Sequence, residues 1–294
     1  MTWELNPDDV ARLVAIVTER SGLAFPESRW PFLRNRAREV VVRSRFTSTR
    51  RWLDELELSA SSRGALYCDL EEALQIHETS FFRYEDQHRL LGECLLPALV
   101  RTGGPRVRIA SVGCSTGEEP YSIAMTVRES LSRPGPCPVE IVALDVSRAA
   151  LTQAVSGTYA EPRVTGVPAP YLGKYFVKAA AGYAVVPALR QMVRFRQHDI
   201  RRGFYIGKFD VIVCCNVLLY FTPAMRAAML ARLAESLWAG GYLFLGHAEG
   251  VTPSAPFVEA RELAAGFVYQ RAAEARLMTA LGPADVPGGS LRHA

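Results

Sequence analysis

Short apolar runs recur from Arg106 onward, separated by stretches that are long enough to form helices. The runs are VRIASVG, VEIVALD, FDVIVCC and GYLFLGH. Consecutive apolar residues rich in Val and Ile are typical of strands that are buried on both faces of a sheet. Strands that alternate with helices form a parallel sheet covered on both sides. We therefore predict a doubly wound, mostly parallel α/β domain over residues 86–270.

The first 85 residues have a different pattern. They contain no convincing period-two segment, whereas apolar residues recur at helical spacing, as at Val10, Leu13, Val14 and Val17. We predict a small all-helical domain with its linker over residues 1–85.

Two later segments depart from the α/β pattern. Apolar positions in residues 171–195 alternate around Ala180, Ala181 and Gly182, which predicts a small antiparallel β insert. Residues 271–294 finish in GPADVPGGSLRHA, which is rich in Gly and Pro and poor in apolar residues. We expect a mobile tail there.

Composition narrows the classes of function. The chain has 294 residues, 49% of them hydrophobic, so it can bury a full core, and its net charge of +4 is too small to indicate wholesale binding to nucleic acid or membranes. No segment approaches the roughly 20 apolar residues of a membrane span, and the first residues are unlike a secretory signal. The six cysteines form no C-x-x-C pair. We expect a soluble cytoplasmic protein without a metal site.

A glycine turn follows the first apolar run. In VGCSTGEEPYSIAM, Gly113 and Gly117 separate a strand from a helix and let the backbone approach a ligand closely. Glu118 and Glu119 stand where a dinucleotide's phosphates would lie, and their charges would repel them. S-adenosylmethionine fits better, because it carries an ammonium and a sulfonium and no phosphate. The alternative is that both acids only favour the helix dipole.

Polar residues also follow the other strands. Asp145 ends VEIVALD, where a carboxylate can accept both ribose hydroxyls. Asp199 can accept from an adenine amino group, and Asn216 can bind the methionyl end or orient a substrate carboxylate. Each of these residues can equally be a helix cap or a turn former.

Several motifs together resemble one family. HETSFFRYEDQ, ASVGCSTGEEPYSIAM, IVALDVSRAAL, VVPALRQMVRFRQHDI and VIVCCNVLLYF are similar to segments of the CheR chemotaxis receptor methyltransferases, and SGLAFPESRWPFLRNRAREVVVRSRF resembles the family's helical domain. The resemblance runs through nearly the whole chain. It implies a Rossmann-like fold and methyl transfer from S-adenosylmethionine to glutamate carboxylates of chemoreceptor cytoplasmic helices, which yields methyl esters and S-adenosylhomocysteine.

The resemblance also implies residue roles. Its catalytic residues are Arg83 and Tyr220, with Arg83 beside the transferable methyl. Its cofactor-binding residues, Arg83 included, are Thr79, Ser80, Gly113, Glu118, Asp145, Asp199, Ile200, Asn216 and Val217.

Two features depart from the family pattern. Members usually carry an arginine immediately before the asparagine of NVLLYF, whereas this chain has Cys215. The insert hairpin, KYFVKAAAGYAVV, is shorter than in members that dock on a receptor's tethering peptide. We therefore expect an enzyme that does not depend on a tether.

The chemistry of the acceptor fits an arginine site. A glutamate with a pKa of about 4.3 is already ionised at pH 7, so the reaction needs no general base and no catalytic histidine. Arg83 can grip the carboxylate while Tyr220 donates a hydrogen bond. For Arg83 the alternative is a surface ion pair with Glu85 or Asp86, but the adjacent phenylalanines favour a partly buried segment.

A basic helix in the first domain is the expected contact for the receptor. An apolar stripe of Trp30, Leu33, Ala37 and Val41 indicates an amphipathic helix. Its arginines would complement a glutamate-rich receptor helix, although a solvated face is the simpler interpretation. Nucleic acid is not expected as a partner, because exposed aromatic residues are not interleaved with the charges. We expect a monomer whose substrate-binding residues are Arg34, Arg36, Arg38, Arg43 and Arg45.

Overall fold

The computed structural model describes residues 4–44, 46–58, 64–102, 106–131, 137–204, 206–250, 258–263 and 266–272. The prediction for Arg45 and nearly all of the predicted tail lie outside these residues. No helix within them is both long enough and apolar enough to span a membrane.

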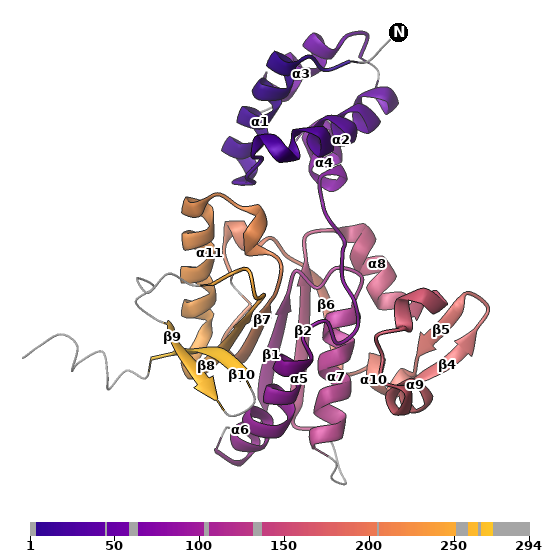
Figure 1. The fold of residues 1–294 in the computed structure, drawn as a ribbon, viewed down its shortest axis with the longest axis vertical. Helices are drawn as coiled ribbons and strands as arrows, with labels where there is room; N and C mark the ends of the chain where they lie inside the picture. Colours follow the sequence, from indigo (N-terminus) through magenta and orange to yellow (C-terminus); the bar gives the residue numbers. More distant parts are fainter. Residues whose placement is uncertain are drawn as a thin grey trace, which may run out of the picture.

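The first domain is helical, as predicted. Its core is built around Leu13, Leu33, Trp52, Leu53 and Leu70, all completely buried. In Figure 1 the domain lies at one end of the molecule and is joined to the rest by a linker. Its helices are α1 (Pro7–Ser21), the 3-10 turn η1 (Glu27–Arg29), α2 (Trp30–Arg43), α3 (Thr49–Leu58) and α4 (Ala65–Ala73).

A seven-stranded sheet forms the second domain, in the order β6-β2-β1-β7-β8-β10-β9. The strands from β6 to β8 are parallel, and β10 is antiparallel to both of its neighbours. The predicted, mostly parallel sheet is therefore confirmed. The strands are β1 (Val107–Val112), β2 (Val139–Asp145), β6 (Val193–Gln197), β7 (Phe209–Cys214), β8 (Leu237–Leu245), β9 (Val258–Leu263) and β10 (Gly266–Arg271).

Helices cover both faces of this sheet. Ile109 and Val211 point into one buried cluster, and their neighbours Ala110 and Ile212 point into another on the opposite face. This alternation confirms the doubly wound arrangement, because each strand buries both of its sides. The helices are α5 (Glu85–Arg89), the π-helical segment η3 (Leu90–Leu95), α6 (Leu96–Thr102), α7 (Glu118–Ser130), α8 (Arg148–Ser156) and α11 (Pro223–Ser236), with short 3-10 turns η5 (Ile200–Arg202) and η6 (Leu218–Tyr220).

The insert is a separate antiparallel sheet with the order β3-β5-β4. The predicted hairpin consists of β4 (Phe176–Ala179) and β5 (Gly182–Val185). A third strand, β3 (Thr158–Tyr159), lies upstream of the predicted range, and β6, which begins inside that range, belongs to the large sheet. The insert also contains η4 (Glu161–Val164), α9 (Ala169–Tyr175) and α10 (Pro187–Arg190).

The two cores divide earlier than residue 85. Leu74 is the last member of the helical core, whereas Phe81 and Phe82 are already buried in the core of the α/β domain. The linker therefore lies between these points, and the FFR segment belongs to the second domain.

Candidate active site

The sheet's topology directs a ligand to one place. Strand β1 has β2 on one side and β7 on the other, so the strand order reverses at β1. Ligands bind at the carboxyl ends of strands beside such a reversal. The glycine turn follows β1 at this point, and Gly113 and Gly117 have φ angles of +72° and +99°. A Cβ on Gly113 would lie 2.3 Å from Val217 Cγ2, so only glycine fits there.

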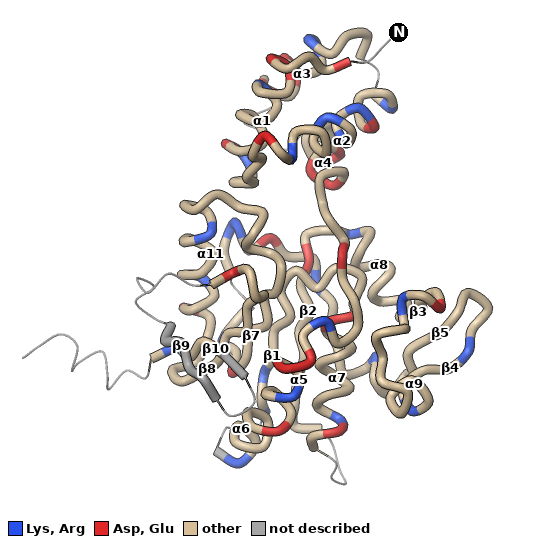
Figure 2. The backbone as a smooth tube through the Cα atoms, viewed as in Figure 1, with Lys and Arg blue, Asp and Glu red and all other residues tan. Residues whose placement is uncertain are grey.

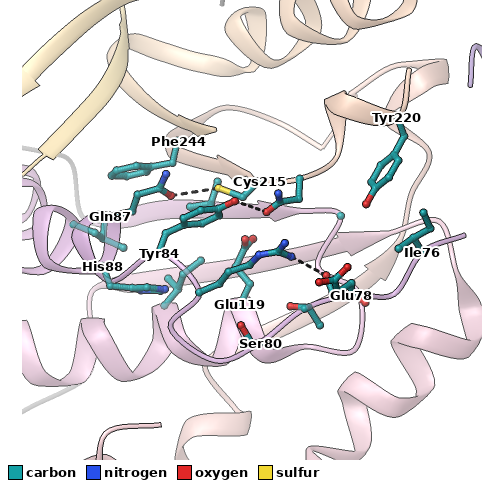
Figure 3. A pocket seen from close by; sticks show the side chains of 18 residues that line it. Ile76, Glu78, Ser80, Tyr84, Gln87, His88, Glu119, Cys215, Tyr220 and Phe244 are labelled. Carbon is teal, nitrogen blue, oxygen red and sulfur yellow. Dashed lines mark hydrogen bonds between the residues drawn. The ribbon is translucent and has the colours of Figure 1, made fainter. Parts of the chain in front are cut away.

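Two adjoining cavities open at these strand ends. Concave sites at this place in an α/β sheet suit a small-molecule ligand. The first cavity, drawn in Figure 3, is lined by Thr79, Ser80 and Arg83, and the second by Asp145, Asp199, Ile200 and Val217. Both share Ile76, Gly113, Ser115, Asn216 and Tyr220. The structure thus brings together every predicted cofactor residue except Glu118.

Asp145 is 8% exposed and is held from both sides by the backbone. Its two carboxylate oxygens accept N–H groups from Ser115, at 2.7 Å, and from Ser147, at 2.8 Å. Burial raises its pKa, and these hydrogen bonds oppose the shift. Each oxygen keeps acceptor capacity, which suits a pair of ribose hydroxyls.

Asp199 lines the second cavity but is already engaged. Its carboxylate accepts two hydrogen bonds from the Arg201 guanidinium, each of 2.8 Å, and Arg201 also pairs with Glu71 of α4 at 2.6 Å. Burial would raise the pKa of Asp199, but the hydrogen bonds and charge of Arg201 outweigh it and lower the pKa. Asp199 also caps η5, so it is both a cap, which was the alternative interpretation, and a residue that lines the cavity.

The structure places Glu118 differently from the prediction. Its carboxylate is completely buried and pairs with Arg163 and Thr116, and it lines neither cavity. Adjacent helical side chains diverge by about 100°, so the two successive acids point in different directions. Glu118 binds Thr116 within the turn, whereas Glu119 points into the first cavity.

Glu119 lines the first cavity and accepts a 2.7 Å hydrogen bond from Ser111 Oγ. Burial raises its pKa to about 7. Sequence reasoning named both acids at the turn and chose Glu118 for the ligand, whereas the structure places Glu119 in the first cavity. The missing signal was the position at which α7 begins, because that position sets the direction of each side chain.

Arg83 lines the first cavity and is itself exposed, at the end of a segment that is partly buried as expected. Its buried neighbours Phe81 and Phe82 pack in the core, so the apolar context extends to the residues before Arg83 but not to its own side chain. Its guanidinium donates to the Glu78 carbonyl at 2.9 Å. Within the described chain it forms no ion pair with Glu85 or Asp86. Most of its donors therefore remain available to a carboxylate.

Asn216 and Tyr220 follow β7 and line both cavities. Asn216 has a φ of +60°, a left-handed conformation that asparagine adopts more readily than other non-glycine residues. Its Oδ1 accepts a 2.7 Å hydrogen bond from the Tyr84 hydroxyl. The Arg29 guanidinium lies 5.1 Å from the centre of the Tyr220 ring, so the helical domain contributes a cation to the same region. Burial raises the pKa of Tyr220, which therefore keeps its proton at neutral pH.

Cys215 occupies the position where the family pattern has arginine. It is buried, and its sulfur lies 3.3 Å from Gln87 Oε1 (Figure 3). Burial raises the pKa of its thiol well above the usual value. A neutral thiol thus lines the first cavity at this position.

The predicted receptor-binding arginines lie outside both cavities. Arg34, Arg38 and Arg43 are exposed on α2, whereas Arg36 is half-buried and pairs with Glu39 at 3.2 Å. Figure 2 shows the positive charges along α2. The buried residues Leu33, Ala37 and Val41 confirm the amphipathic pattern.

The residues present fit S-adenosylmethionine. Ser115 Oγ is buried, lines both cavities and has no hydrogen-bond partner among the described residues, so a ligand can satisfy it. Carboxylates at Asp145 and Glu119 match hydroxyl and ammonium groups. A doubly wound sheet with this glycine turn and these acids defines an S-adenosylmethionine-dependent methyltransferase.

Comparison with known proteins gives the family. The family described as "CheR methyltransferase, SAM binding domain" matches residues 77–262. A chemotaxis protein methyltransferase 2 of Vibrio cholerae is 32% identical over 84% of this chain and 87% of its own, and chemotaxis protein methyltransferase 1 of Pseudomonas aeruginosa is 35% identical over 71% and 79%. One from Listeria monocytogenes is 31% identical over 76% and 83%. The chain belongs to the CheR methyltransferase family.

Proposed function

We propose that this protein transfers the methyl group of S-adenosylmethionine to glutamate side chains of chemoreceptor cytoplasmic helices. The observation that carries the proposal is the position of Arg83, an arginine with uncommitted donors, in a cavity that shares Gly113, Asn216 and Tyr220 with the ribose-side cavity. The relatives named as chemotaxis protein methyltransferases support the substrate class.

For the cofactor we assign the following contacts. Glu119 takes the ammonium of the methionyl end, Asp145 the ribose hydroxyls, and Asp199 with Ile200 the adenine side. Gly113 leaves room for close approach of the backbone. When bound, S-adenosylmethionine supplies an electrophilic methyl group. The remaining contacts in this assignment are Thr79, Ser80, Asn216 and Val217.

The chain's own task is to position the acceptor. Arg83 holds one oxygen of the glutamate carboxylate through its guanidinium, and Tyr220 donates a hydrogen bond. The acceptor is already an anion at pH 7, so no residue has to remove a proton. Positioning of this kind contributes up to about 7–11 kcal/mol to lowering a barrier. His88 does not act as a base, because burial lowers its pKa to about 4 and its ring lies against Thr126 at 3.1 Å.

The receptor contact in this proposal is the arginine face of α2. Exposed Arg34, Arg38 and Arg43 face solvent with few compensating acids, which favours a glutamate-rich helix. The same proposal has the enzyme acting as a monomer in the cytoplasm. Free thiols at all six cysteines are consistent with a reducing compartment.

Labelled S-adenosylmethionine and a purified receptor cytoplasmic fragment test the proposal. Carboxyl methyl esters release methanol in mild base, whereas N-methyl groups do not, so we expect base-labile label on the receptor. Arg83→Ala should keep affinity for S-adenosylhomocysteine and lose transfer. Arg101→Ala, which removes an exposed arginine of α6 that lines neither cavity, is the matched control. Base-stable label would reject the glutamate assignment, and an active Arg83→Ala would reject the role of Arg83.

A further inference from the structure

Glu249 is an almost completely buried acid that lies close behind the site. Only 1% of the residue is exposed. Its hydrogen-bond partners in the described part of the chain are backbone N–H groups: Oε2 accepts from Asn216 at 2.6 Å and from Gly246 at 2.8 Å, and Oε1 accepts from Leu219 at 3.2 Å. A buried carboxylate needs such donors, because burying a polar group without hydrogen bonds is costly.

These three donors come from two different strand ends. Asn216 and Leu219 lie in the segment after β7, and Gly246 follows β8. Glu249 therefore ties the two neighbouring segments together at the edge of the sheet where both cavities open. Leu219 lies within η6 (Leu218–Tyr220), next to Tyr220, and Asn216 lies two residues before η6 begins.

Local geometry shows that the contact is built into both segments. A Cβ on Gly246 would lie 2.7 Å from Glu249 Oε2 and 3.1 Å from both the Asn216 nitrogen and the Tyr84 hydroxyl oxygen. Only glycine lets the carboxylate approach so closely. Asn216 is attached through its main chain to Glu249 and through its side chain to Tyr84.

We propose that Glu249 is a positioning residue for methyl transfer, fixing the segment that presents Asn216 and Tyr220 to the cavities. It touches neither cavity, so its effect passes through the main chain. The inference rests on the proposed function of Tyr220 and Asn216. Its chemical requirement is an acceptor that reaches three N–H groups at once.

Graded substitutions separate this role from general stability. In Glu249→Gln the carbonyl oxygen can still accept from Asn216 and Gly246. The NH2 group, however, takes the place of Oε1 and meets the Leu219 N–H, which is also a donor. Alanine removes all three acceptors. Because a displacement of about 1 Å can cost about 100-fold in rate, we expect Glu249→Ala to lose about 100-fold in kcat and Glu249→Gln about tenfold, with smaller changes in KM for the receptor.

Asp210→Asn is the matched control. Asp210 also accepts a backbone N–H, that of Arg108 at 2.7 Å, but it lies near the start of β7, away from the cavities. We expect it to lower the melting temperature without a comparable loss of kcat. The proposal is overturned if the Glu249 variants keep the wild-type kcat. It is also overturned if their loss of kcat, for each degree by which the melting temperature falls, equals that of Asp210→Asn.

Amide hydrogen exchange gives a readout that does not depend on the reaction. In Glu249→Gln the amides of Asn216 and Leu219 should exchange faster, while amides in β1 remain protected. Unchanged exchange at both amides would overturn the proposal even if activity fell. If the wild-type enzyme makes no base-labile ester on the receptor, the proposed function fails, and the exchange measurement still decides whether Glu249 holds the segment.

Discussion

The hydroxyl of Tyr84 donates a 2.7 Å hydrogen bond to Asn216 Oδ1 and so joins the segment before α5 to the end of β7. This contact spans 132 residues of sequence and lies between the two groups of residues that line the first cavity. Its effects can be measured separately on stability and on activity.

Tyr84→Phe removes this hydrogen bond and leaves the ring in place. We expect a loss of about 1 kcal/mol in the free energy of unfolding and a lower kcat, since Asn216 keeps only its main-chain attachment. Thermal unfolding and steady-state kinetics measure both. Tyr242→Phe is the control, because the Tyr242 hydroxyl makes no hydrogen bond within the described residues. Equal kinetics in the two variants would contradict the role of the contact.

Gly113→Ala should abolish cofactor binding. The added Cβ would lie 2.3 Å from Val217 Cγ2 at a backbone φ of +72°, so both the turn and Val217 must move. Calorimetric titration with S-adenosylhomocysteine measures the loss. Gly173→Ala in α9, where an added Cβ meets nothing within 4 Å, should bind normally and gain about 0.5–1 kcal/mol of stability. Normal binding by Gly113→Ala would show that the turn does not contact the cofactor.

The pKa of Glu119 predicts a pH dependence of binding. Burial raises this pKa to about 7, and the nearby charges are those of Glu249 and Arg83. A cationic ligand prefers the ionised carboxylate, so affinity for S-adenosylmethionine should increase by up to about tenfold from pH 6 to pH 8. The stability of the unliganded protein should instead fall with pH. A carboxyl group whose pKa is raised on folding favours the folded state less as pH rises from about 4.5 to about 7.

Glu119→Gln should remove this pH dependence of binding. Glu118→Gln provides the comparison, since Glu118 pairs with Arg163 away from the cavities. Titrations at both pH values measure the two variants. A pH dependence that survives in Glu119→Gln, or disappears in Glu118→Gln, would return the assignment to Glu118.

The short insert predicts independence from a tether. Strands β4 and β5 are joined by the two residues Ala180 and Ala181, which leaves little loop for docking a peptide. Adding a receptor's C-terminal tethering peptide to the receptor fragment should therefore leave the methylation rate unchanged. The measurement compares initial rates with and without the peptide, and a large gain with it would show that the hairpin binds a tether.

Long-range features of the fold were predictable where a local pattern repeats. The parallel strands, the glycine turn and Asp145 at the end of β2 follow from apolar runs and from residues placed at their ends. Strand β3 was not predictable, because Thr158–Tyr159 is too short to show a period and forms only by pairing with β5. The choice between Glu118 and Glu119 required the helix start, and Glu249 required contacts between distant segments.

The junction between the two domains has a consequence for the release of S-adenosylhomocysteine. Glu71 and Glu72 of α4 bind Arg201 and Ser147, beside the strand ends that carry Asp199 and Asp145. The second cavity is walled by the helical domain as well as by the sheet, with Leu23, Phe25 and Leu74 among its lining residues. We therefore expect the dissociation rate of S-adenosylhomocysteine to depend on two acids of α4 that lie in a different domain from the glycine turn.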